Sequence, residues 1–334
     1  MLAANYKFAL HEFDLLNVKL LKDCNAEMTT LNALLSIMFF PAGITLILSG
    51  MFYEWADRKL VARFQNRIGP RWFQPLADTI KLLTKEEIQP QGIHTLLFYG
   101  LPIIALTGAL TAALYTPILG LTPAYSFPGD LIVTLYLLSL LTMCMGLAGW
   151  NGSSRFSLVG ATRSLTQLFA YEAPFLLALL GPAMAAGSWM IKDITLYAES
   201  HWFILTQPVG FLIALIGLMG KLELPPFDAP EAETEIVAGA LTEYSGRGLA
   251  LFHIGKSVEL VVAVSLVTAF YLGGIGNPLF FLFKTLLILL FMATLQSLLT
   301  RLRIDQTVGM WWRFGAVFAL LQILVMILIK GWLA

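Results

Sequence analysis

Long uncharged apolar segments alternate with shorter polar ones along almost the whole chain. The apolar segments lie at residues 31–53, 93–118, 131–150, 165–190, 202–220, 249–273, 279–299 and 311–330. A helix of about 20 apolar residues crosses the hydrocarbon core of a bilayer, so each segment is suited to span it. The pattern predicts an all-α polytopic membrane protein, with eight transmembrane helices in a single membrane domain over residues 31–334.

Two further helices are expected to lie on the membrane surface. Residues 1–30 mix charged and apolar positions and lack the compact apolar core of a cleaved signal peptide, which predicts an amphipathic N-terminal segment. After Pro75, the apolar residues Leu76, Ile80 and Leu83 recur at helical spacing beside charged positions. This spacing predicts an amphipathic surface helix within the polar segment 54–92.

The cationic residues are distributed unevenly between the predicted loops. The loops at 54–92, 151–164, 221–248 and 300–310 hold thirteen of the 21 Lys and Arg residues, whereas the loop at 191–201 holds only Lys192. The remaining two loops hold none. By the positive-inside rule, the four basic loops are expected in the cytoplasm and both termini outside.

Composition excludes several other classes of protein. Hydrophobic residues make up 58% of the chain and charged ones 13%, and the net charge is zero. These values exclude an ordinary soluble domain, and the chain has no basic block that would bind nucleic acid. Cys24 and Cys144 lie far apart and the four His residues are scattered, so neither a zinc site nor an iron-sulfur cluster is expected in this chain.

The predicted loop at 221–248 is acidic, although cytoplasmic loops usually carry cations. Its six acids, set against two bases, are Glu223, Asp228, Glu231, Glu233, Glu235 and Glu243. The three glutamates at alternate positions are expected to repel one another, which would raise the pKa of their carboxyls and favour proton exchange. The alternative is a solvated loop that docks a basic partner. Apolar flanking residues favour a loop tucked into the protein.

Charged residues also fall inside the predicted spans. Glu172 lies in an otherwise apolar span, two residues before Pro174. Lys256 and Glu259 are three residues apart on one helix, a spacing that predicts a local ion pair. Lys284 lies close to a predicted helix end, where snorkelling to the interface is an equally good interpretation. A chain of such carboxylates with water between them is what proton transfer through a membrane protein requires.

Three stretches of sequence carry the most specific signal. Residues 66–87 read NRIGPRWFQPLADTIKLLTKEE, residues 149–174 read GWNGSSRFSLVGATRSLTQLFAYEAP, and residues 225–246 read PPFDAPEAETEIVAGALTEYSG. All three resemble the H-type membrane subunit of NADH-quinone oxidoreductase, or complex I, and the resemblance covers nearly the full chain. It implies a subunit that joins a peripheral redox arm to antiporter-like membrane subunits in a prokaryotic cell membrane.

The resemblance also implies roles for particular residues and partners. Acids that begin a proton path would be Glu172, Glu223, Asp228, Glu231, Glu233, Glu235 and Glu243, with Arg67 and Tyr244 as supports. Lys256 and Glu259, charged residues inside a predicted span, are added to the expected proton path on the ground of that position. Iron-sulfur clusters, and in a hydrogenase a nickel-iron centre, are implied in the partner subunits and not in this chain.

Two departures from the quinone-reducing members point to a particular branch. After Gly69-Pro70 the chain reaches Gln74-Pro75 at once, where those members usually insert several residues. Lys256 stands where those members typically have an acid. The short loop resembles the energy-converting branch, and the retained PFDAPEAE and EYSG favour its ferredoxin-oxidising hydrogenases and sulfane-sulfur reductases over the formate type.

Three alternatives remain open at the level of sequence. A quinone-reducing complex I subunit would show turnover that depends on quinone. A stand-alone ion antiporter would transport ions as a purified single chain. A purely structural anchor would tolerate neutral substitutes for its buried acids. The sequence does not distinguish hydrogenase from sulfur reductase or protons from sodium.

Overall fold

The computed structural model describes residues 43–333, which form helices and connecting loops with no strand in that range. The predicted N-terminal amphipathic segment and the start of the first span lie outside the described residues. Within this described range, six helices are long and apolar enough to cross a membrane: α4 (Thr95–Tyr115), α5 (Asp130–Trp150), α6 (Arg155–Ala186), α11 (Gly246–Tyr271), α12 (Pro278–Leu298) and the continuous helix Ile304–Leu328. The prediction of an all-helical polytopic membrane protein is confirmed.

Several helix boundaries differ from the predicted ones. α6 begins ten residues before the predicted span, because Ser154 caps it by accepting a hydrogen bond from the Phe156 amide at 3.3 Å. The predicted fifth span is divided between α8 (Phe203–Thr206) and α9 (Pro208–Lys221). Hydropathy detects the apolar middle of a helix and misses its polar continuation, so these boundaries were displaced. The last helix comprises α13 (Ile304–Met310), the π-helical segment η3 (Trp311–Gly315) and α14 (Ala316–Leu333).

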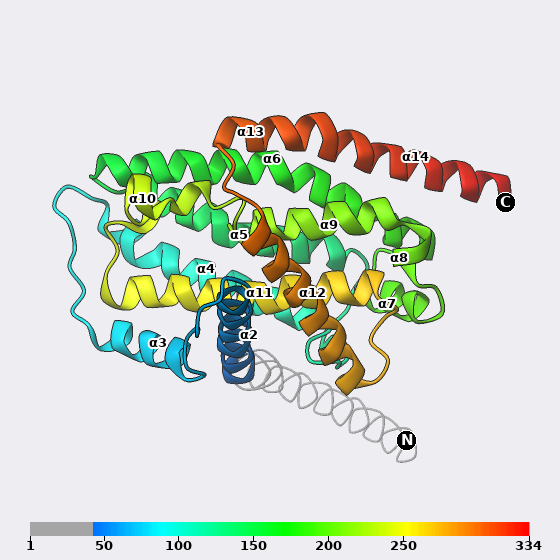
Figure 1. The fold of residues 1–334 in the computed structure, drawn as a ribbon, viewed down its shortest axis with the longest axis horizontal. Helices are drawn as coiled ribbons and strands as arrows, with labels where there is room; N and C mark the ends of the chain where they lie inside the picture. The colour runs from blue at the N-terminus through cyan, green and yellow to red at the C-terminus, as the bar shows by residue number, and fades with distance from the viewer. Residues whose placement is uncertain (1–42, 334) are drawn as a thin grey trace, which may run out of the picture.

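α11 forms the centre of the bundle. Its residues from Leu260 to Phe270 are apolar or small on every side of the helix, a pattern typical of a helix surrounded by protein. In its most apolar stretch 83% of the residues are buried, against 39% for the corresponding stretch of α12. Figure 1 shows α11 running lengthwise through the molecule, and it contacts α2, α4, α9 and α12.

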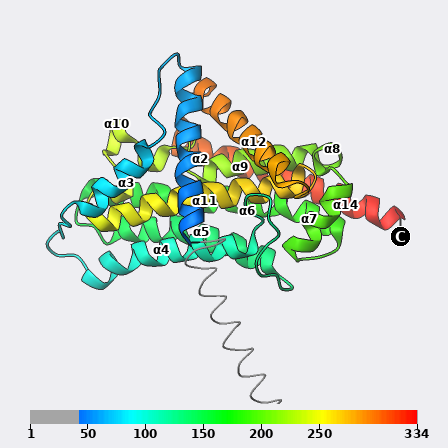
Figure 2. The same cartoon turned by 90° about the horizontal axis from the view of Figure 1, so that it is seen from below.

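α2 (Gly43–Phe64) crosses α11 steeply. It is seen nearly end-on in Figure 1 and stands upright across the other helices in Figure 2. A Cβ on Gly50 would lie 2.8 Å from the Ser257 carbonyl oxygen, so only glycine allows the two backbones to approach this closely. The crossing brings the second half of α2, which hydropathy assigned to a loop, against the charged part of α11.

The loop between α9 and α11 packs into the bundle. It contains the short helices η1 (Ala229–Glu231), α10 (Glu233–Ile236) and η2 (Gly239–Leu241), and η2 lies against α5 and α6. A Cβ on Gly160 would lie 2.3 Å from the Ala240 amide nitrogen, so this packing depends on glycine. The Ser157 hydroxyl also donates to the Ala240 carbonyl at 2.9 Å. The acidic loop is therefore held against the membrane helices.

Two helices complete the described chain at opposite ends of the bundle. α3 (Gln74–Thr84) is the predicted amphipathic helix, and Leu76, Ile80 and Leu83 are indeed exposed along one side of it. α7 (Ile191–Ser200) lies at the other end and buries Ile191, Ile194 and Ala198.

Candidate functional site

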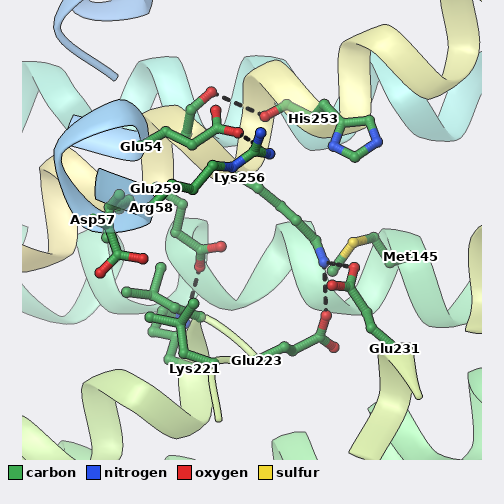
Figure 3. A pocket seen from close by; sticks show the side chains of 14 residues that line it. Glu54, Asp57, Arg58, Met145, Lys221, Glu223, Glu231, His253, Lys256 and Glu259 are labelled. Carbon is green, nitrogen blue, oxygen red and sulfur yellow. Dashed lines mark hydrogen bonds and ion pairs between the residues drawn. The ribbon is translucent and has the colours of Figure 1, made fainter. Parts of the chain in front are cut away.

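A cavity of about 250 Å³ lies where α2, α9, α11 and the acidic loop meet (Figure 3). Its lining is unusually charged for a site in a membrane bundle, since such groups are unfavourable unless they are paired or functional. Five carboxylates face three permanent cations and one histidine. These side chains are Glu54, Asp57, Glu223, Glu231, Glu259, Arg58, Lys221, Lys256 and His253.

Lys256 joins two of the predicted acids across this cavity. Its ammonium lies 2.9 Å from Oε2 of Glu223 and also pairs with Oε1 of Glu231. The Glu223 side chain is 4% exposed and that of Glu231 is 47% exposed. The lysine therefore connects a carboxylate inside the protein to one at its surface.

Glu223 is aimed into the cavity by the way α9 ends. The Leu224 amide donates to the Met219 carbonyl at 3.0 Å, and Glu223 has a left-handed φ of 52°. Helices commonly end on such a residue, but it is usually glycine, because a side chain in this region is disfavoured by about 1–2 kcal/mol. The Ser164 hydroxyl of α6 then donates to Oε1 of Glu223 at 2.9 Å. The end of α9 and the Ser164 hydroxyl together orient the Glu223 carboxylate.

Glu259 forms an ion pair that the sequence did not predict. The expected partner, Lys256 on the same helix, points to Glu223 and Glu231 instead. Glu259 faces Lys221, the last residue of α9, with 3.5 Å between Nζ and Oε1, and both side chains are 2% exposed. The prediction of a local Lys256–Glu259 pair is wrong, because the acidic loop provides closer partners for Lys256.

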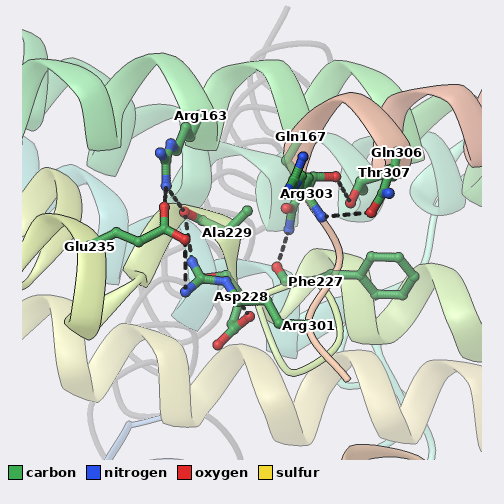
Figure 4. A network of polar contacts seen from close by, with 10 residues as sticks. All are labelled: Arg163, Gln167, Phe227, Asp228, Ala229, Glu235, Arg301, Arg303, Gln306 and Thr307. Carbon is green, nitrogen blue, oxygen red and sulfur yellow. Dashed lines mark hydrogen bonds and ion pairs between the residues drawn. The ribbon is translucent and has the colours of Figure 1, made fainter. Parts of the chain in front are cut away.

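A second polar network holds the acidic loop from its outer side (Figure 4). Arg163 of α6 lies 2.7 Å from Glu235, and Arg301 lies 3.1 Å from Asp228 and 3.8 Å from Glu235. The Arg301 guanidinium also donates to the Asp228 and Ala229 carbonyls at 3.0 and 3.3 Å. The linker between α12 and α13 thus clamps the loop in place.

These cations reverse the expected pKa shifts of the loop glutamates. The hydrogen bond and charge of Arg163 lower the pKa of the Glu235 carboxyl. Burial acts to raise the pKa of Glu231, but the Lys256 ammonium outweighs it and the net shift is downward. At Asp228 burial exceeds the effect of Arg301 and raises the pKa of the carboxyl. The prediction that mutual repulsion raises the pKa of Glu231 and Glu235 is wrong, since each is paired with a cation.

Several predicted site residues lie away from the cavity. Glu243 accepts hydrogen bonds from the Ser153 amide and hydroxyl, both at 2.8 Å, and so ties the loop to the start of α6. Tyr244 is buried, with its ring stacked on Phe98 at 4.5 Å. Arg67 lies on the exposed loop after α2. The Glu233 side chain lies outside what the structure describes.

Glu172 is separate from the cavity as well. It lies deep within α6, half-buried, on the side of the helix that also carries Phe169, whose side chain is 64% exposed. No ion pair or hydrogen bond to its carboxylate occurs among residues 43–333. A carboxylate on an outward side of a membrane helix is unfavourable in lipid, so this position requires a polar neighbour.

The structure adds residues that the sequence did not single out. Asp57 and Glu54 of α2 line the cavity, and Gln296 of α12 donates to Asp57 at 3.1 Å. Lys221 was counted only as a positive charge on the cytoplasmic side. Hydropathy placed Glu54 and Asp57 in a loop, so their burial could not be foreseen. For Lys221, its position at the end of an apolar run beside Glu223 was a usable signal.

Comparisons with known proteins agree on one family. A model of the family described as NADH dehydrogenase matches residues 26–327. An H-type subunit of NADH-quinone oxidoreductase from Geobacter sulfurreducens is 37% identical over 320 residues, covering 90% of this chain and 95% of that protein. The corresponding NADH-quinone oxidoreductase subunit from Dehalococcoides mccartyi is 33% identical over 299 residues, covering 84% and 82% respectively. A chain of the membrane-bound sulfane sulfur reductase, an archaeal respiratory membrane complex, superimposes with a TM-score of 0.79 at 25% identity, covering 89% of this chain and 99% of that one.

Proposed function

Because the chain belongs to the NADH dehydrogenase family and is a membrane subunit of a complex I-related complex, we propose that it couples electron transfer in partner subunits to proton or sodium movement. The observation that carries this proposal is the Lys256 bridge between buried Glu223 and exposed Glu231. A charge at the surface of the acidic loop is thereby linked to carboxylates inside the bundle.

Coupling by this bridge is electrostatic. A redox step in the peripheral arm changes the charge or position of the acidic loop, and Glu231 moves relative to Lys256. Two unit charges about 7 Å apart interact by roughly 2 kcal/mol at an effective dielectric constant near 20. That energy exceeds the 1.36 kcal/mol that corresponds to one pKa unit, so the loop can change the protonation of Glu223 and Glu259.

The cavity is poorly suited to bind a quinone. Sites for small organic ligands are mostly apolar and usually span about 300–1,000 Å³. This cavity is about 250 Å³ and is lined by eight charged side chains. Lys256 lines it and reaches between Glu223 and Glu231, with which it is paired (Figure 3). These features favour the ion-coupling role over quinone reduction.

Two further observations support a particular branch of the family. The loop after α2 is short, running from Gly69-Pro70 directly to Gln74-Pro75, and the similar solved chain comes from a sulfane sulfur reductase. We place the chain in a ferredoxin-oxidising complex, either a membrane-bound hydrogenase or a sulfane-sulfur reductase. Its iron-sulfur clusters, and any nickel-iron centre, belong to the peripheral partners.

Glu172 extends the path toward the membrane partners. Its place on the outward side of α6 suits contact with a helix of an antiporter-like subunit, where a polar group at the same depth would pair with it. Ions or protons released from the cavity region would then pass to that subunit.

Neutralising Glu172 tests this function. In proteoliposomes that contain the purified complex, Glu172→Gln is expected to abolish redox-driven ion uptake while all subunits still co-purify. Thr166→Val, on the same exposed side of α6, serves as the matched control and should retain uptake. Uptake at the wild-type rate in Glu172→Gln would remove this residue from the path.

A further inference from the structure

A second pocket, of about 440 Å³, lies beside the acidic loop at the end of the bundle predicted to be cytoplasmic. It is formed by the start of α6, by η1 and by the linker between α12 and α13. Three arginines line it: Arg163, Arg301 and Arg303. Two carboxylates, Glu235 and Asp305, also line it. The proposed ion coupling does not use this pocket.

One of the three guanidinium groups is left without a carboxylate partner. Arg163 pairs with Glu235, and Arg301 pairs with Asp228 and Glu235. Arg303 forms no ion pair within the described part of the chain, although it is close enough to Glu235 to lower the pKa of that carboxyl. Asp305 likewise forms no ion pair among the described residues, so the lining holds three guanidinium groups against two carboxylates, an excess of one cation. The arginines keep N–H groups that can donate to a ligand.

Exposed apolar side chains lie on both sides of Arg301 and Arg303 along the chain. Leu298 and Leu299, just before the arginines, are 77% and 48% exposed. Trp312 and Phe314, just after α13, are 54% and 58% exposed. A tryptophan and leucines beside a basic linker are typical of the membrane-water interface, where a helix leaves the hydrocarbon core. The pocket thus opens at the level of the lipid headgroups.

We propose that this pocket binds the headgroup phosphate of an anionic phospholipid. The phosphate accepts hydrogen bonds from Arg303 and its neighbouring arginines, and the acyl chains lie over the exposed apolar side chains of α12 and α14. Basic pockets between membrane helices on the cytoplasmic side are suited to such headgroups. Guanidinium groups match phosphate oxygens better than ammonium groups do, because their N–H donors form a planar fork.

A lipid in this position also contacts the clamp on the acidic loop. Arg301 holds the Asp228 and Ala229 carbonyls, and the Leu302 amide donates to the Pro226 carbonyl at 3.0 Å. A bound phosphate neutralises the excess positive charge of the linker that makes these contacts. The site is independent of whether the complex pumps ions, so it can be tested without that activity.

Native mass spectrometry of the purified complex measures the site directly. Phosphatidylglycerol is titrated against the wild type, Arg303→Gln and Arg155→Gln, where Arg155 is an exposed arginine outside the pocket. We expect about fivefold weaker retention in Arg303→Gln, since one basic residue near the membrane surface contributes roughly 1 kcal/mol. Arg155→Gln should bind as the wild type, and phosphatidylcholine should bind much more weakly. Arg303→Lys should fall between the wild type and Arg303→Gln, because it keeps the charge but loses the planar fork of N–H donors.

Several outcomes would overturn the proposal. Equal retention by Arg303→Gln and the wild type would show that the arginine does not hold the lipid. If phosphatidylcholine bound as tightly as phosphatidylglycerol, the lipid would be held by apolar contacts and not by recognition of its negative charge. Displacement of phosphatidylglycerol by inorganic phosphate at the same concentration would assign the site to free phosphate. A cross-link from position 303 to an acidic segment of another subunit in the native complex would assign it to a protein partner.

Discussion

The Glu223→Gln variant is expected to lose redox-driven ion uptake while the complex still assembles. Ser164 and Lys256 each donate to one oxygen of the Glu223 carboxylate at 2.9 Å. Glutamine keeps the shape, and its single carbonyl oxygen can still accept from Lys256, while its NH2 group can donate to the Ser164 hydroxyl oxygen. It cannot bind or release a proton at this position. Removing a positioned proton-transferring group typically slows a reaction by about 100-fold or more, and we expect a loss of that size in uptake by proteoliposomes.

The control for this prediction is an exposed carboxylate on the same side of the molecule. Glu86→Gln lies after α3, outside the cavity lining, and should leave ion uptake unchanged. Subunit composition, checked by co-purification, separates a coupling defect from failed assembly. Wild-type uptake in Glu223→Gln would show that protons do not pass through this carboxylate.

The second large expected effect is a loss of stability when the buried ion pair between Lys221 and Glu259 is broken. Lys221 and Glu259 are both 2% exposed and lie 3.5 Å apart, so removing either one leaves a buried charge without its partner. We expect Lys221→Met and Glu259→Leu each to destabilise the protein by about 3–5 kcal/mol. The double variant should recover most of this loss, because two apolar side chains of similar size avoid the unfavourable burial of charge. Thermal unfolding of the complex in lipid nanodiscs measures all three variants.

The exposed pair Arg163–Glu235 provides the comparison. Arg163→Gln should change stability far less than either Lys221→Met or Glu259→Leu, as is usual for a pair near the surface. If the Lys221–Glu259 double variant were as unstable as the sum of its two single variants, the two charges would not interact, and the pair would have to be reassigned.

Hydropathy along the sequence predicts most of the membrane helices but not how they cross one another. The apolar spans predicted α4, α5, α11 and α12 to within a few residues, because lipid imposes a simple length requirement. The steep crossing of α2 over α11 depends on Gly50, and nothing in the composition of α2 marks that glycine as a contact. The predicted orientation and the N-terminal helix stay predictions.

For the site, the sequence identified residue types but not their partners. The motif PPFDAPEAETE marked the acidic loop, and Lys256 was noted for replacing an acid. Which cation each glutamate meets is decided by the tertiary fold: Lys256 for Glu223 and Glu231, and Arg163 for Glu235. Sequence spacing alone predicts repulsion between the loop glutamates and an ion pair between Lys256 and Glu259 within α11. In the structure, cations from distant parts of the chain pair with these acids instead.

The central proposal is that reduction of the partner subunits changes the protonation of carboxyl groups in this cavity. Infrared difference spectroscopy of the purified complex, recorded between its oxidised and reduced states, detects the C=O stretch of a carboxyl that gains or loses a proton. We predict a carboxyl band in the wild type that is absent from Glu223→Gln and retained in Glu86→Gln. A reduced-minus-oxidised spectrum with no carboxyl band, or with the same band in Glu223→Gln, would contradict electrostatic coupling through this site.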